Sequence, residues 1–153
     1  MEILSCDYAD TVHREAVAML IDAYVADGMG GGTPLDDAGR ARLLEGLERH
    51  PTAIVLLARV DGAFCGLLVA FENFATFMAR PMINIHDVIV LREYRGRGTG
   101  RRLMRAIADE AARRGCCRIT LEVRNDNIIA QRLYRSEGFD ETHPRHYYWR
   151  KYL

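Results

Sequence analysis

Residues 83–104 read INIHDVIVLREYRGRGTGRRLM, and this stretch decides the fold. Its apolar, β-branched run over residues 88–91 predicts the end of a strand that begins near Met82. A polar turn leads into a glycine-rich segment, residues 95–100, which reads RGRGTG. Apolar residues then recur at spacings of three and four from Leu103 to Ala111, as is typical of an amphipathic helix. The predicted order is therefore strand, glycine-rich turn, helix.

The glycine-rich turn has the properties of an anion site. Glycine adopts backbone angles that other residues resist, and it leaves no side chain between the backbone and a ligand. The first N–H groups of a helix lack internal partners, and the helix dipole adds partial positive charge there. The turn therefore predicts a site for a pyrophosphate, although a glycine turn that only caps a surface helix is the alternative.

Three known glycine patterns can be compared with this turn. A P-loop requires Lys after its last glycine, but Arg101 follows Gly100. The dinucleotide fingerprint G-x-G-x-x-G would require Gly or Ala at position 101, so it is also excluded. The third pattern fits, because Arg95-x-x-Gly98-x-Gly100 matches the R/Q-x-x-G-x-G/A loop that binds the pyrophosphate of acyl-coenzyme A. That loop belongs to the GNAT acyltransferase superfamily, which this stretch resembles.

A second segment carries the same resemblance. Residues 127–139 read NIIAQRLYRSEGF, similar to the GNAT signature N-x-x-A-x-x-L-Y-x-x-x-G-F. One predicted helix and one predicted strand join the two signatures, in the order that the family has. The resemblance is strong over residues 83–139 and only architectural before them.

Composition indicates a globular protein. The chain has 153 residues, of which 49% are hydrophobic and 27% charged, which predicts a single domain over residues 1–153. Zero net charge gives no global field for nucleic acid or membrane, and no apolar run approaches spanning length. The four cysteines have no C-x-x-C spacing, so no metal site is expected. Free cysteines and an N-terminus unlike a signal peptide predict a cytoplasmic protein.

Periodicity and turn residues divide the rest of the chain. Thr33, followed by Pro34, is the predicted N-cap of a second helix, and residues 30–32 predict a flexible linker. Asp61-Gly62 predicts a hairpin turn, and residues 72–81 a loop or strand edge. Strands are predicted over residues 2–6, 53–60, 63–71, 82–91, 117–123 and 146–153, and helices over 11–27, 33–49, 99–113 and 127–137.

These elements predict an α/β fold with helices on both faces of a mixed sheet. The strands over 82–91 and 117–123 are joined by a helix, so they must be parallel. The resemblance adds a GNAT-type sheet, mostly antiparallel, whose central parallel pair splays apart at the coenzyme site.

The resemblance implies acetyl-CoA as co-substrate and roles for particular residues. The backbone of Val88, Ile89 and Val90 is expected to pair with the pantetheine arm. Asn127 and Ala130 are expected beside that arm, and the Tyr134 hydroxyl is expected to protonate the leaving sulfur. Asn127 as a helix cap and Tyr134 as a core residue are the structural alternatives. The pyrophosphate loop consists of Arg95, Gly96, Arg97, Gly98, Thr99, Gly100 and Arg101.

At the expected position of the general base the chain departs from the family's commonest pattern, in which a Glu stands on the central strand. His86 and Asp87 stand near that position, and imidazole accepts a proton near neutral pH. Asp87 should point to the opposite face from His86 unless a β-bulge intervenes. Glu72 and Glu122 are reserve candidates that could act through water or hold the substrate. Asn84 should share a face with His86 and contact the substrate.

The function predicted from the resemblance is N-acetylation of a primary amine, most plausibly of a small molecule, by direct attack in a ternary complex. A protein N-terminus or lysine is a second kind of acceptor. A non-catalytic coenzyme-A sensor and an RNA-binding module are alternatives from other classes, against which Tyr134 and the zero net charge argue respectively. A homodimer is expected from the family's habit, and no nucleic-acid or membrane partner.

Overall fold

The structure is a computed structural model that describes residues 1–30, 32–144 and 146–153. The chain forms two compact units, Met1–Glu122 and Val123–Leu153. A single domain over residues 1–153 stays a prediction. The predicted linker at residues 30–32 lies partly outside the described residues, because Gly31 is not among them.

The first unit contains a five-stranded sheet in the order β1-β2-β3-β4-β5. Neighbouring strands are antiparallel except for β4 and β5, which are parallel. The prediction of a mixed, mostly antiparallel sheet is confirmed. The strands are β1 (Glu2–Ser5), β2 (Ala53–Val60), β3 (Ala63–Ala75), β4 (Arg80–Val90) and β5 (Ile119–Leu121).

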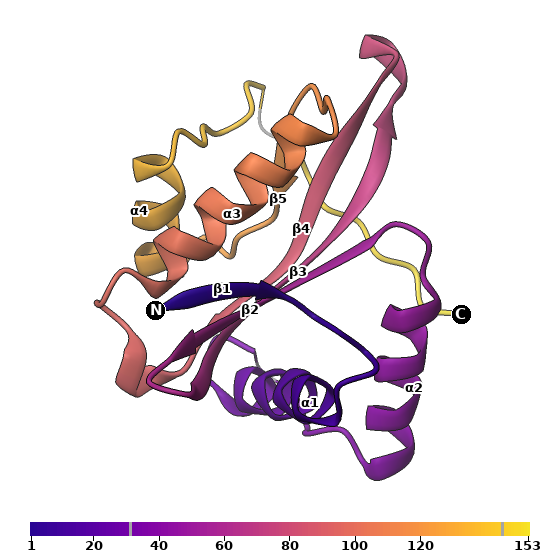
Figure 1. The fold of residues 1–153 in the computed structure, drawn as a ribbon. Coiled ribbons are helices and arrows are strands. Elements are labelled where there is room, and N and C mark those ends of the chain that lie inside the picture. Colours follow the sequence, from indigo (N-terminus) through magenta and orange to yellow (C-terminus); the bar gives the residue numbers. More distant parts are fainter. Residues whose placement is uncertain (31, 145) are drawn as a thin grey trace. The chain divides into compact units, whose positions relative to one another are not determined.

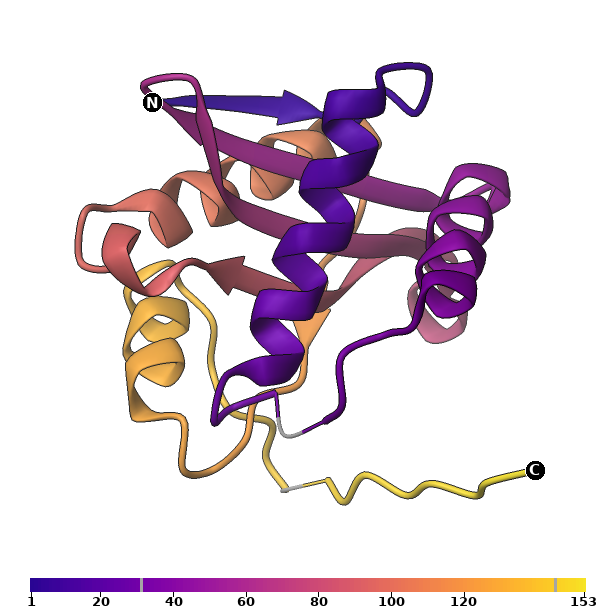
Figure 2. The same cartoon turned by 90° about the horizontal axis from the view of Figure 1, so that it is seen from below.

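Helices cover both faces of this sheet (Figure 1). Helix α1 (Thr11–Ala26) packs on one face against β2, β3 and β4, and α2 (Asp37–Arg49) packs beside α1. Helix α3 (Thr99–Arg113) contacts β1 to β4, and Figure 2 shows α1 and α3 on opposite sides of the sheet. The predicted arrangement of helices on both faces is therefore confirmed.

The apolar residues that recur periodically in the sequence form two core layers, one on each face of the sheet. On the α1 side, Val17 and Leu20 pack with Leu57, Leu67 and Ile89. On the other side, the buried stripe of α3 consists of Leu103, Met104, Ile107 and Ala111. Each fully buried aliphatic side chain contributes about 1.5–3 kcal/mol, so both faces of β2 and β3 are held by burial.

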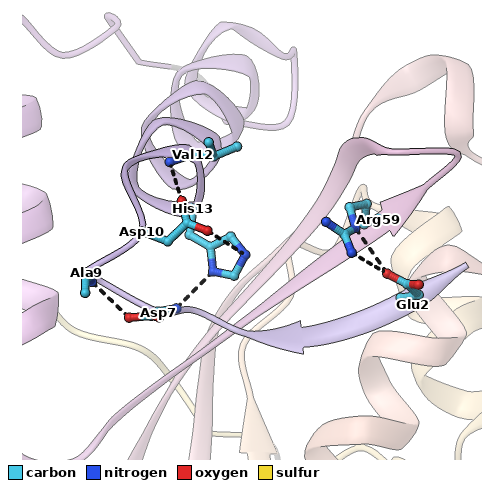
Figure 3. A network of polar contacts seen from close by, with 7 residues as sticks. All are labelled: Glu2, Asp7, Ala9, Asp10, Val12, His13 and Arg59. Carbon is cyan, nitrogen blue, oxygen red and sulfur yellow. Dashed lines mark hydrogen bonds and ion pairs between the residues drawn. The ribbon is translucent and has the colours of Figure 1, made fainter.

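The junction between β1 and α1 is fixed by polar contacts (Figure 3). The Asp10 carboxylate caps α1 by accepting the Val12 N–H at 2.8 Å, and His13 Nδ1 accepts the Asp7 N–H at 3.0 Å. Arg59 donates two hydrogen bonds to the Glu2 carboxylate, at 2.8 and 3.1 Å, across the β1–β2 pair. These contacts position the edge strand, although an exposed ion pair adds only about 0–1 kcal/mol.

Several element boundaries differ from the predicted ones, and the largest differences are in α2, β3 and β5. Helix α2 begins at Asp37 rather than Thr33, because the Asp36 carboxylate accepts the Gly39 N–H at 2.7 Å and is the N-cap. Strand β3 continues to Ala75, so most of residues 72–81 is paired strand with a short turn at its tip; of the two predicted alternatives, the strand holds and the loop does not. Strand β5 is limited to three residues because it pairs with β4 only there.

The predicted closing strand over residues 146–153 is wrong. Those residues form no strand in the structure, and Tyr147, Trp149 and Tyr152 are each more than 80% exposed. Aromatic and β-branched residues favour a strand by packing against neighbours, and this segment has no strand neighbour among the described residues.

The second unit is built around helix α4 (Ile128–Ser136). Asn127 is its N-cap, and its side-chain oxygen accepts the Ala130 N–H at 3.2 Å. Gly138 has φ of +88°, which ends the helix, and the Phe139 N–H then donates to the Tyr134 carbonyl at 3.0 Å. Both helix boundaries therefore agree with the signature's asparagine and glycine. None of the helices in the described ranges, in either unit, is long and apolar enough to cross a membrane.

One buried polar atom gives a stability prediction. The Tyr8 hydroxyl is buried without a hydrogen-bond partner among the described residues, and burial raises the pKa of this phenol. Replacing Tyr8 with Phe removes an unsatisfied group and keeps the ring. We expect the free energy of unfolding in urea to stay unchanged or to rise by up to about 1 kcal/mol. A loss of more than about 1 kcal/mol would show that the hydroxyl has a partner.

Candidate coenzyme and acceptor site

The glycine-rich turn follows β4 directly. After a short 3₁₀ turn over Arg92–Tyr94, Gly96 and Gly98 have φ of +73° and +82°, in the left-handed region that disfavours other residues. Gly98 is the N-cap of α3 and offers no side chain to cap it. The helix therefore begins with its N–H groups uncovered by any capping side chain.

The backbone N–H groups of this turn are available to a ligand. Among the described residues, none accepts a hydrogen bond from the N–H groups of Gly96, Arg97, Gly98, Thr99 or Gly100. A methyl group placed on Gly96 or Gly98 would meet no described atom within 4 Å. Several unpaired N–H groups at a helix start, with space above them, suit a phosphate or diphosphate.

The arginines around the turn have different partners. The Arg95 guanidinium has two partners in the first unit: Nε donates to the Val90 carbonyl at 2.9 Å and Nη2 to the Asp27 carboxylate at 2.8 Å. The Arg97 guanidinium lies 5.7 Å from the centroid of the Tyr94 ring. Arg95 therefore connects the start of the turn to β4 and to the end of α1. Its predicted role was contact with the pyrophosphate.

Strand β4 has an unpaired edge next to the turn. It pairs with β5 only from Ile83 to Ile85, and no strand in the described ranges pairs with this edge from His86 to Val90. The Leu91 N–H donates to the Cys65 carbonyl of β3, so by alternation Ile89 also faces β3. Val88 and Val90 consequently direct their N–H and carbonyl groups toward the unpaired edge.

A β-bulge in β4 brings His86 and Asp87 to one face. Val69 lies opposite Asp87 and Ala70 opposite Ile85, so His86 is the extra residue. The His86 ring stands edge-on to Phe71 at 4.8 Å between centroids, and Phe71 packs against the α1-side core. Asp87 shares that side, because its cross-strand partner Val69 belongs to the same core. Because of the bulge, His86 and Asp87 share one face of the sheet, whereas strict alternation would place them on opposite faces.

Asp87 and Asn84 have distinct environments on this face. Burial raises the pKa of the Asp87 carboxyl, while the neighbouring His86 charge pulls that pKa down. Asn84, which lies opposite Phe71, donates from Nδ2 to the Thr120 hydroxyl at 2.9 Å. Asn84 therefore ties β4 to β5 at the point where their pairing ends.

Comparison with known proteins decides the family. The model of the acetyltransferase (GNAT) family matches residues 17–139 of this chain. The chain belongs to the GNAT family. The glycine turn and helix α4, with Asn127 and Tyr134, both lie inside the matched residues. The resemblance carried by the two signatures is therefore confirmed.

Curated relatives match only part of their length. An uncharacterized N-acetyltransferase, YhfO of Bacillus subtilis, is 30% identical over 62% of this chain and 63% of its own. N-alpha-acetyltransferase RimI of Mycobacterium tuberculosis is 40% identical over 56% of this chain and 53% of its own. The streptothricin acetyltransferase of Streptomyces lavendulae is 46% identical over 48% and 39%. The matched segment thus spans about two-fifths to two-thirds of these relatives.

Solved structures share the fold across the whole chain. A probable acetyltransferase superposes with a TM-score of 0.86 at 22% identity, covering 100% of this chain and 99% of that one. The aminoglycoside N-acetyltransferase AAC(6')-Iy in complex with CoA gives a TM-score of 0.78 at 21% identity, covering 99% and 95%. At such identities the likeness shows the GNAT fold alone.

The remaining predicted site residues of this GNAT chain lie on different elements. Glu72 forms an ion pair with Arg114, just after α3, at 2.7 Å, so it is not brought to the face that His86 and Asp87 share. Glu122 is exposed after the end of β5. In the second unit, Asn127 caps α4, and Tyr134 lies half-buried one helical turn after Ala130.

Sequence reasoning missed two residues of the first unit. Phe71 contacts the rings of both His86 and His50, at 4.8 and 4.6 Å between centroids, and its place at the end of a predicted strand was the only signal. Asp27 holds Arg95, and its only signal was its place before Gly28 at the end of a helix. The described residues contain no group of three or more His, Cys, Asp or Glu side chains that could hold a metal ion.

Proposed function

We propose that this GNAT chain transfers the acetyl group of acetyl-CoA to the primary amine of a small molecule, by direct attack. The observation that carries the proposal is a row of unpaired N–H groups from Gly96 to Gly100 beside the unpaired edge of β4. The first feature suits the diphosphate of the coenzyme, and the second suits an extended arm that carries amide groups. Family membership supports both assignments.

Binding by β4 would orient the thioester. Val88 offers its N–H and carbonyl groups to the pantetheine amides, as a neighbouring strand would, and Val90 offers its N–H group, because its carbonyl already accepts from Arg95. One of these N–H groups would donate to the thioester oxygen and stabilise the negative charge that develops there. Arg95 contributes by holding the turn, and the N–H groups of the turn, including Arg101, hold the diphosphate.

His86 is the proposed general base. The bulge places it on the face shared with Asp87, whose negative charge would attract an ammonium group and stabilise an imidazolium. His86 takes the proton that the amine loses, the amine nitrogen bonds to the acetyl carbon, and the carbon–sulfur bond breaks. The role assigned to Tyr134 is to supply a proton to the departing thiolate, and the role assigned to Asn127 and Ala130 is to contact the coenzyme arm.

The relatives support two candidate kinds of amine acceptor. Streptothricin acetyltransferase and L-ornithine N5-acetyltransferase bear the names of small molecules with amino groups. The RimI relative, at 40% identity, favours a second candidate, in which the acceptor is the N-terminal amine of a protein. Asn84, Glu72 and Glu122 stay predictions as substrate residues, as do a homodimer and a cytoplasmic location.

A thiol-release assay with acetyl-CoA tests the proposal and separates the two candidates. The panel contains an aminoglycoside, ornithine, a linear diamine and a peptide with an N-terminal alanine, each checked for acetylation by mass spectrometry. We expect turnover with at least one small amine. Turnover with the peptide alone would favour the second candidate, and coenzyme binding without turnover on any amine would contradict catalysis.

Replacing His86 with Ala tests the base. We expect kcat to fall by about 100-fold at pH 7, as is typical for loss of a general base, with the Kd of coenzyme A within about twofold of wild type. The matched control is His50→Ala, because His50 also contacts Phe71, at 4.6 Å between ring centroids, but lies outside β4. Equal losses of kcat in both variants would assign His86 to the packing of Phe71.

A further inference from the structure

Asp27 organises the segment that follows α1. Its N–H donates to the Tyr24 carbonyl at 3.0 Å and ends the helix, and its own carbonyl accepts the Gly30 N–H at 2.9 Å. Its carboxylate Oδ1 accepts the Met29 N–H at 3.0 Å. The Met29 N–H, and after it Arg95, hold the pKa of this carboxyl below its ordinary value. One side chain therefore shapes the beginning of the loop between α1 and α2.

The second carboxylate oxygen reaches the coenzyme side of the molecule. Asp27 Oδ2 accepts from Arg95 Nη2 at 2.8 Å, across 68 positions of sequence, while Arg95 Nε donates to the Val90 carbonyl at 2.9 Å. Arg95 thus joins the end of α1, the start of the glycine turn and the end of β4. A cavity of about 310 Å³ lies among these elements, lined in part by Asp27, Gly28, Val90 and Arg95.

This pair is more buried than the pair that Arg59 forms with Glu2 across β1 and β2. The Asp27 side chain is only 16% exposed, against 59% for Glu2 in its pair with Arg59. The planar guanidinium of Arg95 uses separate nitrogens for a backbone carbonyl and a carboxylate, so its direction is fixed by two elements. An arginine held in this way sets the position of the residue that begins the turn.

We propose that Asp27 is a positioning residue that, by holding Arg95, sets the glycine turn against the edge of β4 at the spacing that coenzyme A requires. The inference rests on the proposed function, because it assigns the coenzyme to the turn and that edge. Without the carboxylate charge, Arg95 keeps a single carbonyl partner, and the turn is free to shift relative to Val90. The affinity for coenzyme A then falls, although Asp27 itself need not contact the ligand.

The test is Asp27→Asn, whose amide oxygen can still accept the Met29 N–H but which removes the charge that Arg95 faces. Calorimetric titration with coenzyme A is done on wild type, Asp27→Asn, Arg95→Gln and the double variant. The control is Glu2→Gln, which removes the charge of another surface ion pair, in which Arg59 donates two hydrogen bonds to one Glu2 carboxylate oxygen. Melting temperatures of all five proteins show how much stability each pair contributes.

We expect Asp27→Asn and Arg95→Gln each to raise the Kd of coenzyme A about tenfold, with Glu2→Gln within about twofold of wild type. Because Asp27 acts through Arg95, the double variant should bind no more weakly than Arg95→Gln alone. In turnover assays the KM for acetyl-CoA should rise in Asp27→Asn, while kcat at saturating acetyl-CoA stays within about twofold.

Two results would overturn the inference. One is an unchanged Kd in Asp27→Asn while the wild type binds coenzyme A, which leaves the proposed function intact. The other is a double variant about a hundredfold weaker than wild type, because independent effects would multiply. A wild-type protein that binds no coenzyme A would overturn the proposed function together with this inference.

Discussion

Replacing Gly98 with alanine is expected to weaken coenzyme A binding by about 30-fold. Gly98 has φ of +82°, and a methyl group there would enter the space above the N–H groups of the turn. Each hydrogen bond to a charged group contributes about 1.5–3 kcal/mol, and 1.4 kcal/mol is a tenfold change in Kd, so losing one such bond gives an effect of about this size. Calorimetric titration with coenzyme A measures the effect.

The control for Gly98→Ala is Gly115→Ala, at the opposite end of α3. Gly115 also has a positive φ, of +66°, and a methyl group there would meet no described atom within 4 Å. Both variants should lose about 1–2 kcal/mol of unfolding free energy from left-handed strain. Only Gly98→Ala should lose coenzyme affinity. Equal coenzyme affinity in the two variants would mean that the turn does not hold the diphosphate.

Replacing Tyr134 with Phe is expected to lower kcat by about 100-fold or more, because a general acid contributes about 10²–10⁴ to the rate. The ring is retained, so its packing near Phe139, at 6.0 Å between centroids, should persist. The KM for acetyl-CoA should therefore change little. Steady-state kinetics with the best amine of the panel measures both constants.

Tyr8→Phe is the matched control for Tyr134→Phe, because it removes a phenol hydroxyl from a half-buried ring at the edge of the α1-side core. It should leave kcat unchanged. Acetyl thioesters of thiols with different pKa values would add support. A general acid assists the poorest leaving thiolates most, so the rate should depend less on thiol pKa in wild type than in Tyr134→Phe. Full activity in Tyr134→Phe would remove this residue from the chemistry and leave thiolate departure unassisted.

Local signals in the sequence predicted the glycine turn and the strand and helix beside it well. The strand, the glycine turn and the helix each depend on neighbouring residues: apolar alternation, glycines with positive φ, and a stripe at helical spacing. Gly115 ends α3 as predicted, and Asn127 caps α4, which was the structural alternative for that residue; both depend on contacts within a few residues. Asp61 and Gly62 form the predicted hairpin turn with φ of +49° and +83°.

Features that depend on distant partners could not be predicted in the same way. The bulge at His86 exists because β4 pairs with β3 on both sides of it, and no single strand specifies that register. The Asp27–Arg95 pair joins residues 68 positions apart. Thr33 and Asp36 are both good caps, and the contact to the Gly39 N–H decided between them. The aromatic tail has strand composition but no strand to pair with in the described structure.

The account depends on main-chain N–H groups from Gly96 to Arg101 holding the diphosphate of the coenzyme. A crystal structure of the protein with acetyl-CoA tests this most directly. We predict diphosphate oxygens within hydrogen-bond distance, about 2.7–3.2 Å, of at least two of these nitrogens, with the pantetheine arm along Val88 and Val90. A coenzyme bound elsewhere, with the turn contacting only solvent, would contradict the account.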